Sequence, residues 1–194
     1  MKKIIPIVFS LLLLGPTHLL AQEWKVDPVH SGILFDIKHI YSTVRGNFSD
    51  FTGDMFFDPD NLGKSRFGFA VRVDSINTLN DRRDTHLRSE DFFAANQYPM
   101  MTFKSARVTH VGGNKYLVEG NLTIKDVSKN VVLEFIYWGQ KEYPFKKGQM
   151  VAGFDCPFKI NRLEYHVGNG KYYNMGVLAK DVDILITLEV LRDK

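Results

Sequence analysis

Gly32-Ile33-Leu34-Phe35-Asp36-Ile37-Lys38-His39 places a large apolar residue at every second position. A period of two is typical of a β-strand that has one face in an apolar core. The same alternation recurs along most of the chain, and no βαβ spacing interrupts it. The sequence therefore predicts an all-β protein whose strands surround an apolar interior.

About eight such strands follow one another, joined mostly by hairpins such as the Gly112-Gly113-Asn114 turn. A long antiparallel meander that buries one face can close into a barrel, which removes its exposed edges. Gly46 and Gly53 lie within strand patterns and indicate bends or bulges in a strongly curved sheet. We therefore predict a single antiparallel barrel, with room inside for its own side chains or for one slender ligand.

One segment, residues 80–97, departs from the β pattern. Asn80 or Asp81 can cap a helix, and polar and apolar residues follow at helical spacing. Tyr98 precedes Pro99, and a residue before proline disfavours the helical region. We predict a short helical insert near residues 80–97.

Residues 1–21 have the features of a secretory signal peptide, with two lysines, a short apolar stretch and a small residue at the cleavage point after about Ala21. The apolar stretch is too short to span a bilayer comfortably. Without Lys2 and Lys3, the 25 basic residues become 23 against 22 acidic ones, so residues 22–194 carry a net charge of +1. We expect one periplasmic or secreted domain over 22–194, with no integral membrane segment and no affinity for nucleic acid.

Motifs for catalysis and for metal binding are weak. His30 and Ser31 are neighbours that enter a strand, so their side chains point to opposite faces, which does not suit a triad with Asp27. The histidines lack the spacing of a zinc site, and the single cysteine, Cys156, has no partner. The pattern around Cys156 predicts a small buried hydrophobe. We expect no catalytic residues, no metal site and no enzyme activity.

Six stretches of sequence carry a resemblance to a known family. They are residues 27–31 with 35–39, residues 44–48 with 51–53, residues 75–78, residues 83–93, residues 98–99 with 102–105, and residues 120–125. In order and spacing they resemble the YceI-like family of bacterial lipid-binding proteins, over nearly all of the chain after the signal. Near the C-terminus Arg162 fits the family pattern, whereas the residues that follow it differ.

The resemblance implies a lipocalin-like barrel, secreted or periplasmic, that holds a long isoprenoid chain of the polyprenyl or quinone type. For some members it implies fatty acids or their amides instead. We expect the inward apolar side chains to line the lumen as ligand contacts: Phe35, Ile37, Phe48, Phe69, Val71, Phe103, Leu122, Phe135, Phe154, Phe158 and Ile186. The alternative is that they pack against one another and leave no space.

The strongest polar cluster lies on the predicted helical insert. At one barrel end, Arg83, His86 and Arg88 can meet a phosphate or quinone head group. Alternatively, Asp84 pairs with a neighbouring arginine and the cluster stabilises the helix. The full set of expected head-group and entrance residues is His39, Arg83, His86, Arg88, Phe92 and Phe93, with the two phenylalanines as a lid.

The sequence thus predicts non-catalytic binding, sequestration or transport of a long-chain isoprenoid lipid. The alternatives are a carrier of fatty acids or their amides, a ligand-free stress-response module with a solid interior, and an enzyme that acts on a lipid-derived substrate. No cofactor is expected apart from a bound isoprenoid or quinone-type lipid. Exposed edges and entrance loops leave a homodimer open.

Overall fold

The computed structural model describes residues 23–194. The expected signal peptide and its cleavage after Ala21 lie outside the described residues. The strands are β1 Trp24–Val26, β2 Gly32–His39, β3 Ser42–Phe48, β4 Phe51–Phe56, β5 Arg66–Arg72, β6 Ile76–Asn77, β7 Met100–Gly112, β8 Lys115–Ile124, β9 Val127–Glu142, β10 Gln149–Asn161 and β11 Leu178–Asp193. The helices are α1 Asp81–Arg88 and α2 Lys171–Asn174, with short 3-10 turns at Leu62–Lys64, Val73–Ser75 and Arg162–Tyr165.

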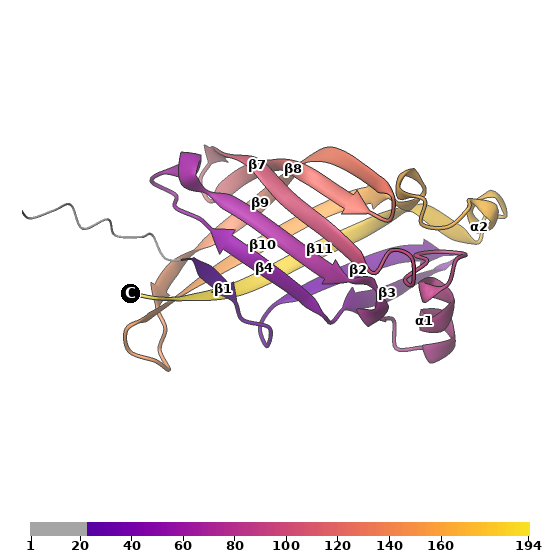
Figure 1. The fold of residues 1–194 in the computed structure, drawn as a ribbon, viewed down its shortest axis with the longest axis horizontal. Helices are drawn as coiled ribbons and strands as arrows, with labels where there is room; N and C mark the ends of the chain where they lie inside the picture. The colour runs from indigo at the N-terminus through magenta and orange to yellow at the C-terminus, as the bar shows by residue number, and fades with distance from the viewer. Residues whose placement is uncertain (1–22) are drawn as a thin grey trace, which may run out of the picture.

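All strand pairs are antiparallel, and they close into an eight-stranded barrel, as the sequence predicts (Figure 1). β1 and β2 lie end to end along β11, so together they take one strand position. β3 and β4 take the next position in the same way, because β2 pairs with β3 and β1 pairs with β4. The ring closes where Lys25 of β1 pairs with Leu191 of β11. The eight positions enclose one continuous interior.

The inward-facing residues change in burial along β10 and β11. On β11, Val190 and Leu188 are buried, whereas Ile184 on the same face remains partly accessible. On β10 the same change runs from Phe154 to Phe158. Because these side chains point into the barrel, their accessibility comes from space inside it. One end of the barrel is therefore solid and the other end is hollow.

Aromatic rings fill the solid end. The ring of Phe57 meets those of Tyr116, Phe135 and Phe154 edge to face, with centroids 5.2, 5.7 and 5.4 Å away. Such edge-to-face pairs are favourable because the positive ring edge faces the negative ring face. The indole Nε1 of Trp24 donates to the carbonyl oxygen of Phe57 at 3.3 Å. This packing closes the barrel at the end that carries β1.

Neither Gly46 nor Gly53 forms the predicted bulge, because the strand register is regular at both positions. Gly46 pairs with Phe35, and Gly53 pairs with Phe69. A Cβ on Gly46 would stand 2.4 Å from Phe35 Cζ, and one on Gly53 would stand 2.3 Å from Phe69 Cε1. Both glycines leave room for the ring of the residue across the sheet.

The helical insert forms as predicted. α1 begins after Asn80, whose side-chain oxygen accepts from the backbone N–H of Arg83 at 3.0 Å. The second helix, α2, has no counterpart among the elements predicted from the sequence. Within residues 23–194, no helix is both long enough and apolar enough to cross a membrane.

Candidate functional site

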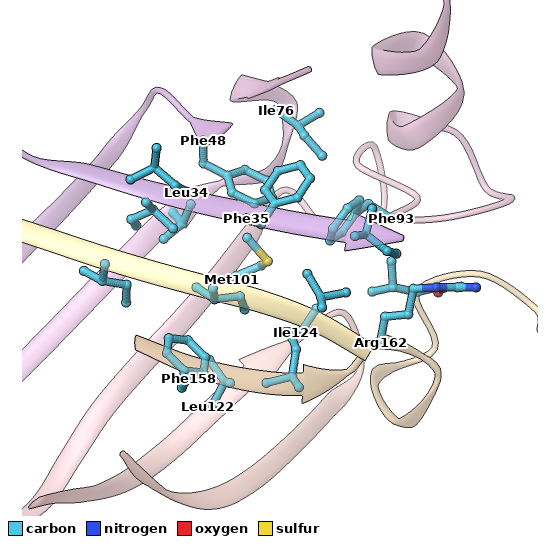
Figure 2. A pocket seen from close by; sticks show the side chains of 18 of the residues that line it. Leu34, Phe35, Phe48, Ile76, Phe93, Met101, Leu122, Ile124, Phe158 and Arg162 are labelled. Atoms are coloured by element: carbon cyan, nitrogen blue, oxygen red, sulfur yellow. Dashed lines mark hydrogen bonds between the residues drawn. The ribbon is translucent and has the colours of Figure 1, made fainter. Parts of the chain in front are cut away.

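An apolar cavity of about 520 Å³ occupies the hollow end of the barrel. Small-molecule sites in proteins commonly measure about 300–1,000 Å³. Figure 2 shows Phe35 and Phe48 on one side of this space, with Leu122 and Phe158 on the other. The structure therefore contains a site of ligand size that is walled by hydrocarbon.

Every apolar residue that the sequence assigns to the lumen lines this cavity. These residues are Phe35, Ile37, Phe48, Phe69, Val71, Phe103, Leu122, Phe135, Phe154, Phe158 and Ile186. They do not share one environment. Phe135 and Phe154 are only 4% exposed and form the floor against the aromatic packing, whereas Ile37 and Phe158 border open space. Their role as ligand contacts stays a prediction.

Five of the six expected entrance residues also line the cavity, namely His39, Arg83, His86, Phe92 and Phe93. Arg88 is not among the lining residues. Its Nη1 donates to the carbonyl oxygens of Asp74 at 3.2 Å and Ile76 at 3.3 Å. Arg88 therefore ties α1 to the segment before it instead of facing a ligand.

The sequence suggests that Asp84 pairs with a neighbouring arginine, but Thr78 stands between Asp84 and its neighbour Arg83. Arg83 donates from Nε to the Thr78 hydroxyl at 2.7 Å and from Nη2 to the Thr78 carbonyl oxygen at 2.8 Å. The backbone N–H and the hydroxyl of Thr78 both donate to the buried carboxylate of Asp84. The charge of Arg83 is thus held at the cavity rim, with two of its donors already used.

The two helical segments meet above the cavity through aromatic rings. Phe92 stacks on Tyr172 of α2, with centroids 5.9 Å apart. The ring of His86 lies edge-on to both, at 5.1 Å from Phe92 and 6.1 Å from Tyr172. His86 Nε2 is also 2.9 Å from the carboxylate of Asp91. Sequence reasoning found Phe92 and His86 but missed Tyr172, because α2 itself was not predicted.

The segment around α1 (residues 80–97) and the segment around α2 (residues 162–177) are together called the cap. Arg162 lines the cavity and is buried at the start of the second segment. Its Nε donates to the carbonyl oxygen of Ala179 at 2.9 Å and its Nη1 to that of Val167 at 2.7 Å. Its Nη2 has no hydrogen-bond partner. Burial lowers the pKa of this guanidinium. Arg162 was noted in the sequence as a family match but not as a site residue.

Lys125 fastens the cap from the other side. Its Nζ donates to the carbonyl oxygens of Phe92 and His166, both at 2.7 Å. Burial lowers the pKa of this ammonium group. The two bonds join the loop after α1 to the loop before α2, so the cap is held as one unit.

Among the cavity-lining residues that the structure describes, none carries a carboxylate. The more polar ones are His39, Ser42, Arg83, His86, Thr102, Cys156, Arg162 and Tyr172. Burial raises the pKa of the Cys156 thiol to about 12, so the thiol is neutral near pH 7. A neutral thiol is a poor nucleophile, which agrees with the reading of Cys156 as a small apolar residue.

Asp27, His30 and Ser31 are not among the cavity-lining residues. His30 Nδ1 is 2.8 Å from a carboxylate oxygen of Asp27, and this hydrogen bond raises the pKa of His30. Ser31 Oγ instead donates to the carbonyl oxygen of Glu189 at 3.1 Å and accepts from its N–H at 3.0 Å. His30 and Ser31 are therefore not hydrogen-bonded to each other in these contacts, and Ser31 binds the backbone of Glu189. The ligand atoms of Asp27, His30 and Glu189 lie within 4.8 Å of one another.

Three comparisons place this geometry among known proteins. A family model described as a YceI-like domain matches residues 24–190. The UPF0312 protein plu2095 of Photorhabdus laumondii is 33% identical over 196 residues, which cover 100% of this chain and 98% of that protein. The crystal structure of BcnA from Burkholderia cenocepacia superposes with a TM-score of 0.74 at 25% identity, covering 86% of this chain and 99% of BcnA.

A more distant structure shares the fold. A polyisoprenoid-binding domain from Saccharophagus degradans superposes with a TM-score of 0.63 at 14% sequence identity. The superposition covers 86% of this chain and 97% of that domain. The barrel is thus shared by proteins that retain few of the same residues.

Proposed function

Because the chain belongs to the YceI-like family, we propose that it binds a long-chain isoprenoid lipid of the polyprenyl or quinone type inside its barrel, without catalysing a reaction. The observation that carries this proposal is the hollow half of the barrel, a cavity of about 520 Å³ with hydrocarbon walls. A solid interior would have favoured the ligand-free alternative.

The apolar wall can supply the binding free energy by itself. Each buried methylene group contributes about 0.8 kcal/mol. A dozen such carbons therefore give roughly 10 kcal/mol before ordering costs, which is enough for about micromolar binding. Specific hydrogen bonds are not needed for affinity, so the site need not be rich in polar groups.

The description of one protein with the same fold supports an isoprenoid over a fatty acid or its amide. The Saccharophagus domain is described as polyisoprenoid-binding. The many phenylalanine rings of the cavity wall offer flat faces to the methyl branches of isoprene units. Fatty acids and their amides remain the second candidate class.

The polar residues of the cavity favour a head group that accepts hydrogen bonds. Arg83, His86 and Arg162 bring positive or neutral donors to the cavity, and none of the described residues that line it carries a carboxylate. Phosphate and quinone oxygens are acceptors and suit such a rim. The neutral thiol of Cys156 also supports binding over nucleophilic catalysis.

The expected site of action is the periplasm or the exterior of the cell, on the basis of the signal-like residues 1–21. Hydrophobic sequestration makes physical sense there, because a long isoprenoid chain is almost insoluble in water. The barrel would shield the chain while the lipid is away from a membrane.

Neighbouring residues of β11 give a matched test. Ile184 lines the cavity, whereas Leu185 points outward and is 40% exposed. We expect Ile184→Glu to abolish lipid co-purification, because a charge in the apolar wall cannot be solvated beside a bound chain. Leu185→Glu places the same charge outside and should leave the lipid content unchanged. Native mass spectrometry and extraction of the purified proteins measure both.

Each outcome separates the alternatives. Loss of lipid in Ile184→Glu alone supports the cavity as the binding site. Lipid retained by a folded Ile184→Glu protein contradicts it. A wild-type protein that is compact but empty favours the ligand-free module, turnover of the extracted lipid favours an enzyme, and a fatty acid in the extract favours the second ligand class.

A further inference from the structure

Five large apolar side chains are exposed at the end of the barrel where the cavity lies. We call them the docking face: Ile40, Tyr41, Leu79, Tyr173 and Met175. Tyr41 is fully exposed and Leu79 is 92% exposed. Single exposed apolar residues are common on protein surfaces, but a group at one place marks an interaction site.

Three segments far apart in sequence carry these residues at the same end of the barrel. The turn between β2 and β3 carries Ile40, whose N–H donates to the carbonyl oxygen of Val177 at 2.9 Å, next to α2. α1 and α2 are joined through His86 and Tyr172, whose ring centroids are 6.1 Å apart. Figure 1 shows α1, α2 and the end of β2 at the same end of the barrel.

Neither burial nor local backbone geometry accounts for these side chains. Ile40 and Leu79 have φ of +51° and +61°, a region that favours glycine and asparagine and disfavours β-branched and bulky residues. A two-residue connection such as Ile40-Tyr41 between antiparallel strands normally carries small or polar residues. Large apolar groups at these positions weaken the local fold, and Tyr41 and Leu79 gain almost no packing in the monomer.

Three basic residues accompany the docking face. Lys38, Arg82 and Lys171 lie on the same three segments, and Asp81 is the one acidic residue on them (residues 38–43, 79–82 and 171–177). Within the part of the chain that the structure describes, these three basic residues form no ion pair with a carboxylate. Lys38 donates only to the Thr43 hydroxyl, at 2.6 Å.

We propose that the docking face binds the surface of a lipid bilayer that contains anionic head groups. Tyrosine and aliphatic side chains would enter the interfacial region, and the basic residues would lie among the phosphates. This inference rests on the proposed function, because it places the lipid-binding cavity directly against the membrane that supplies or receives the lipid. The cargo then passes between bilayer and barrel without crossing water.

The test uses the protein with sedimentable vesicles of phosphatidylcholine, with or without phosphatidylglycerol. The protein is expected to bind the vesicles that contain phosphatidylglycerol. The double variant Tyr41→Ser/Leu79→Ser should bind at least about tenfold more weakly, because two large apolar groups no longer enter the interface. The double variant Lys38→Gln/Lys171→Gln should lose most of the dependence on phosphatidylglycerol.

Phe145 provides the matched control. It is 86% exposed and stands beside Lys146 and Lys147 in the loop between β9 and β10, at the solid end of the barrel. Phe145→Ser should leave vesicle binding unchanged. Thermal unfolding of each variant checks that the fold is kept, which we expect because all the substituted residues are on the surface.

Several outcomes would overturn the inference. Equal losses in Phe145→Ser and in Tyr41→Ser/Leu79→Ser would mean that binding does not depend on this end of the barrel. No vesicle binding by a wild-type protein that still carries lipid would remove the docking face and leave the proposed function intact. A dimer in sedimentation experiments that Tyr41→Ser/Leu79→Ser dissolves, without vesicle binding, would show that a second copy covers this face.

Discussion

The ring of Phe35 lies directly over the backbone of Gly46, its partner across β2 and β3. A Cβ on Gly46 would stand 2.4 Å from Phe35 Cζ and 2.9 Å from the backbone oxygen of Asn77. Phe35 is also a wall of the cavity. A residue without a side chain thus fixes where one aromatic wall of the site stands.

We expect Gly46→Val to destabilise the protein by about 1–3 kcal/mol, because overpacking forces the Phe35 ring and a neighbouring strand to move. Gly68→Ala is the control, since the nearest atom to its Cβ would be 3.9 Å away. That variant should be neutral or slightly stabilising. Urea unfolding measures both, and equal effects of the two substitutions would contradict the close packing at Gly46.

The solid and hollow ends predict different costs for removing a ring. Phe135→Ala should cost about 3–5 kcal/mol, because it opens a void inside the aromatic packing. Phe158→Ala should cost about half as much or less in lipid-free protein, since that ring already borders open space. Thermal or urea unfolding of lipid-free samples measures the difference. Similar losses would mean that the hollow end is packed in solution.

The buried carboxylate of Asp84 is expected to hold the cap in place. Asp84→Ala leaves the backbone N–H of Thr78 unpaired and should cost about 1–3 kcal/mol. Hydrogen exchange should become faster in α1. Asp81→Ala, an exposed substitution in the same first turn, should have a much smaller effect. Unchanged exchange in Asp84→Ala would show that Thr78 finds other partners.

Cys156 gives a prediction about pH. Its raised pKa, about 12, keeps the folded protein's thiol neutral, so alkylation by iodoacetamide should stay slow up to about pH 10 and rise sharply on unfolding. An unfolded thiol ionises near its ordinary pKa of 9.0. Stability from this group is therefore complete below pH 9 and is lost as the pH rises toward 12. Cys156→Ala should remove that part of the alkaline loss.

The alternation of apolar residues was sufficient to predict the barrel and the inward face of each strand. Ile37 and Phe158 follow from a period of two, and the structure places both in the cavity wall. The period could not reveal which inward residues touch each other and which border space. Phe135 and Phe158 have the same pattern in the sequence, but Phe135 is buried whereas Phe158 remains partly accessible.

The cap was harder to predict than the wall. Asn80 is a recognisable N-cap and predicts α1. In contrast, α2 has four residues and no side-chain cap. Its formation therefore depends on tertiary contacts such as the stacking of Tyr172 on Phe92. Arg88 looked equivalent to Arg83 in the sequence. Only the folded structure shows that two carbonyl oxygens of the preceding segment already bind Arg88. Long-range packing decided both cases.

The aromatic packing around Phe57 fills one end of the barrel with the protein's own side chains. That end is therefore packed whether or not the proposed lipid is bound. Entry and release of such a lipid would require only the opposite end of the barrel to open. Substitutions that reshape the chamber for a longer or shorter guest can therefore accumulate while the part that keeps the chain folded is left alone.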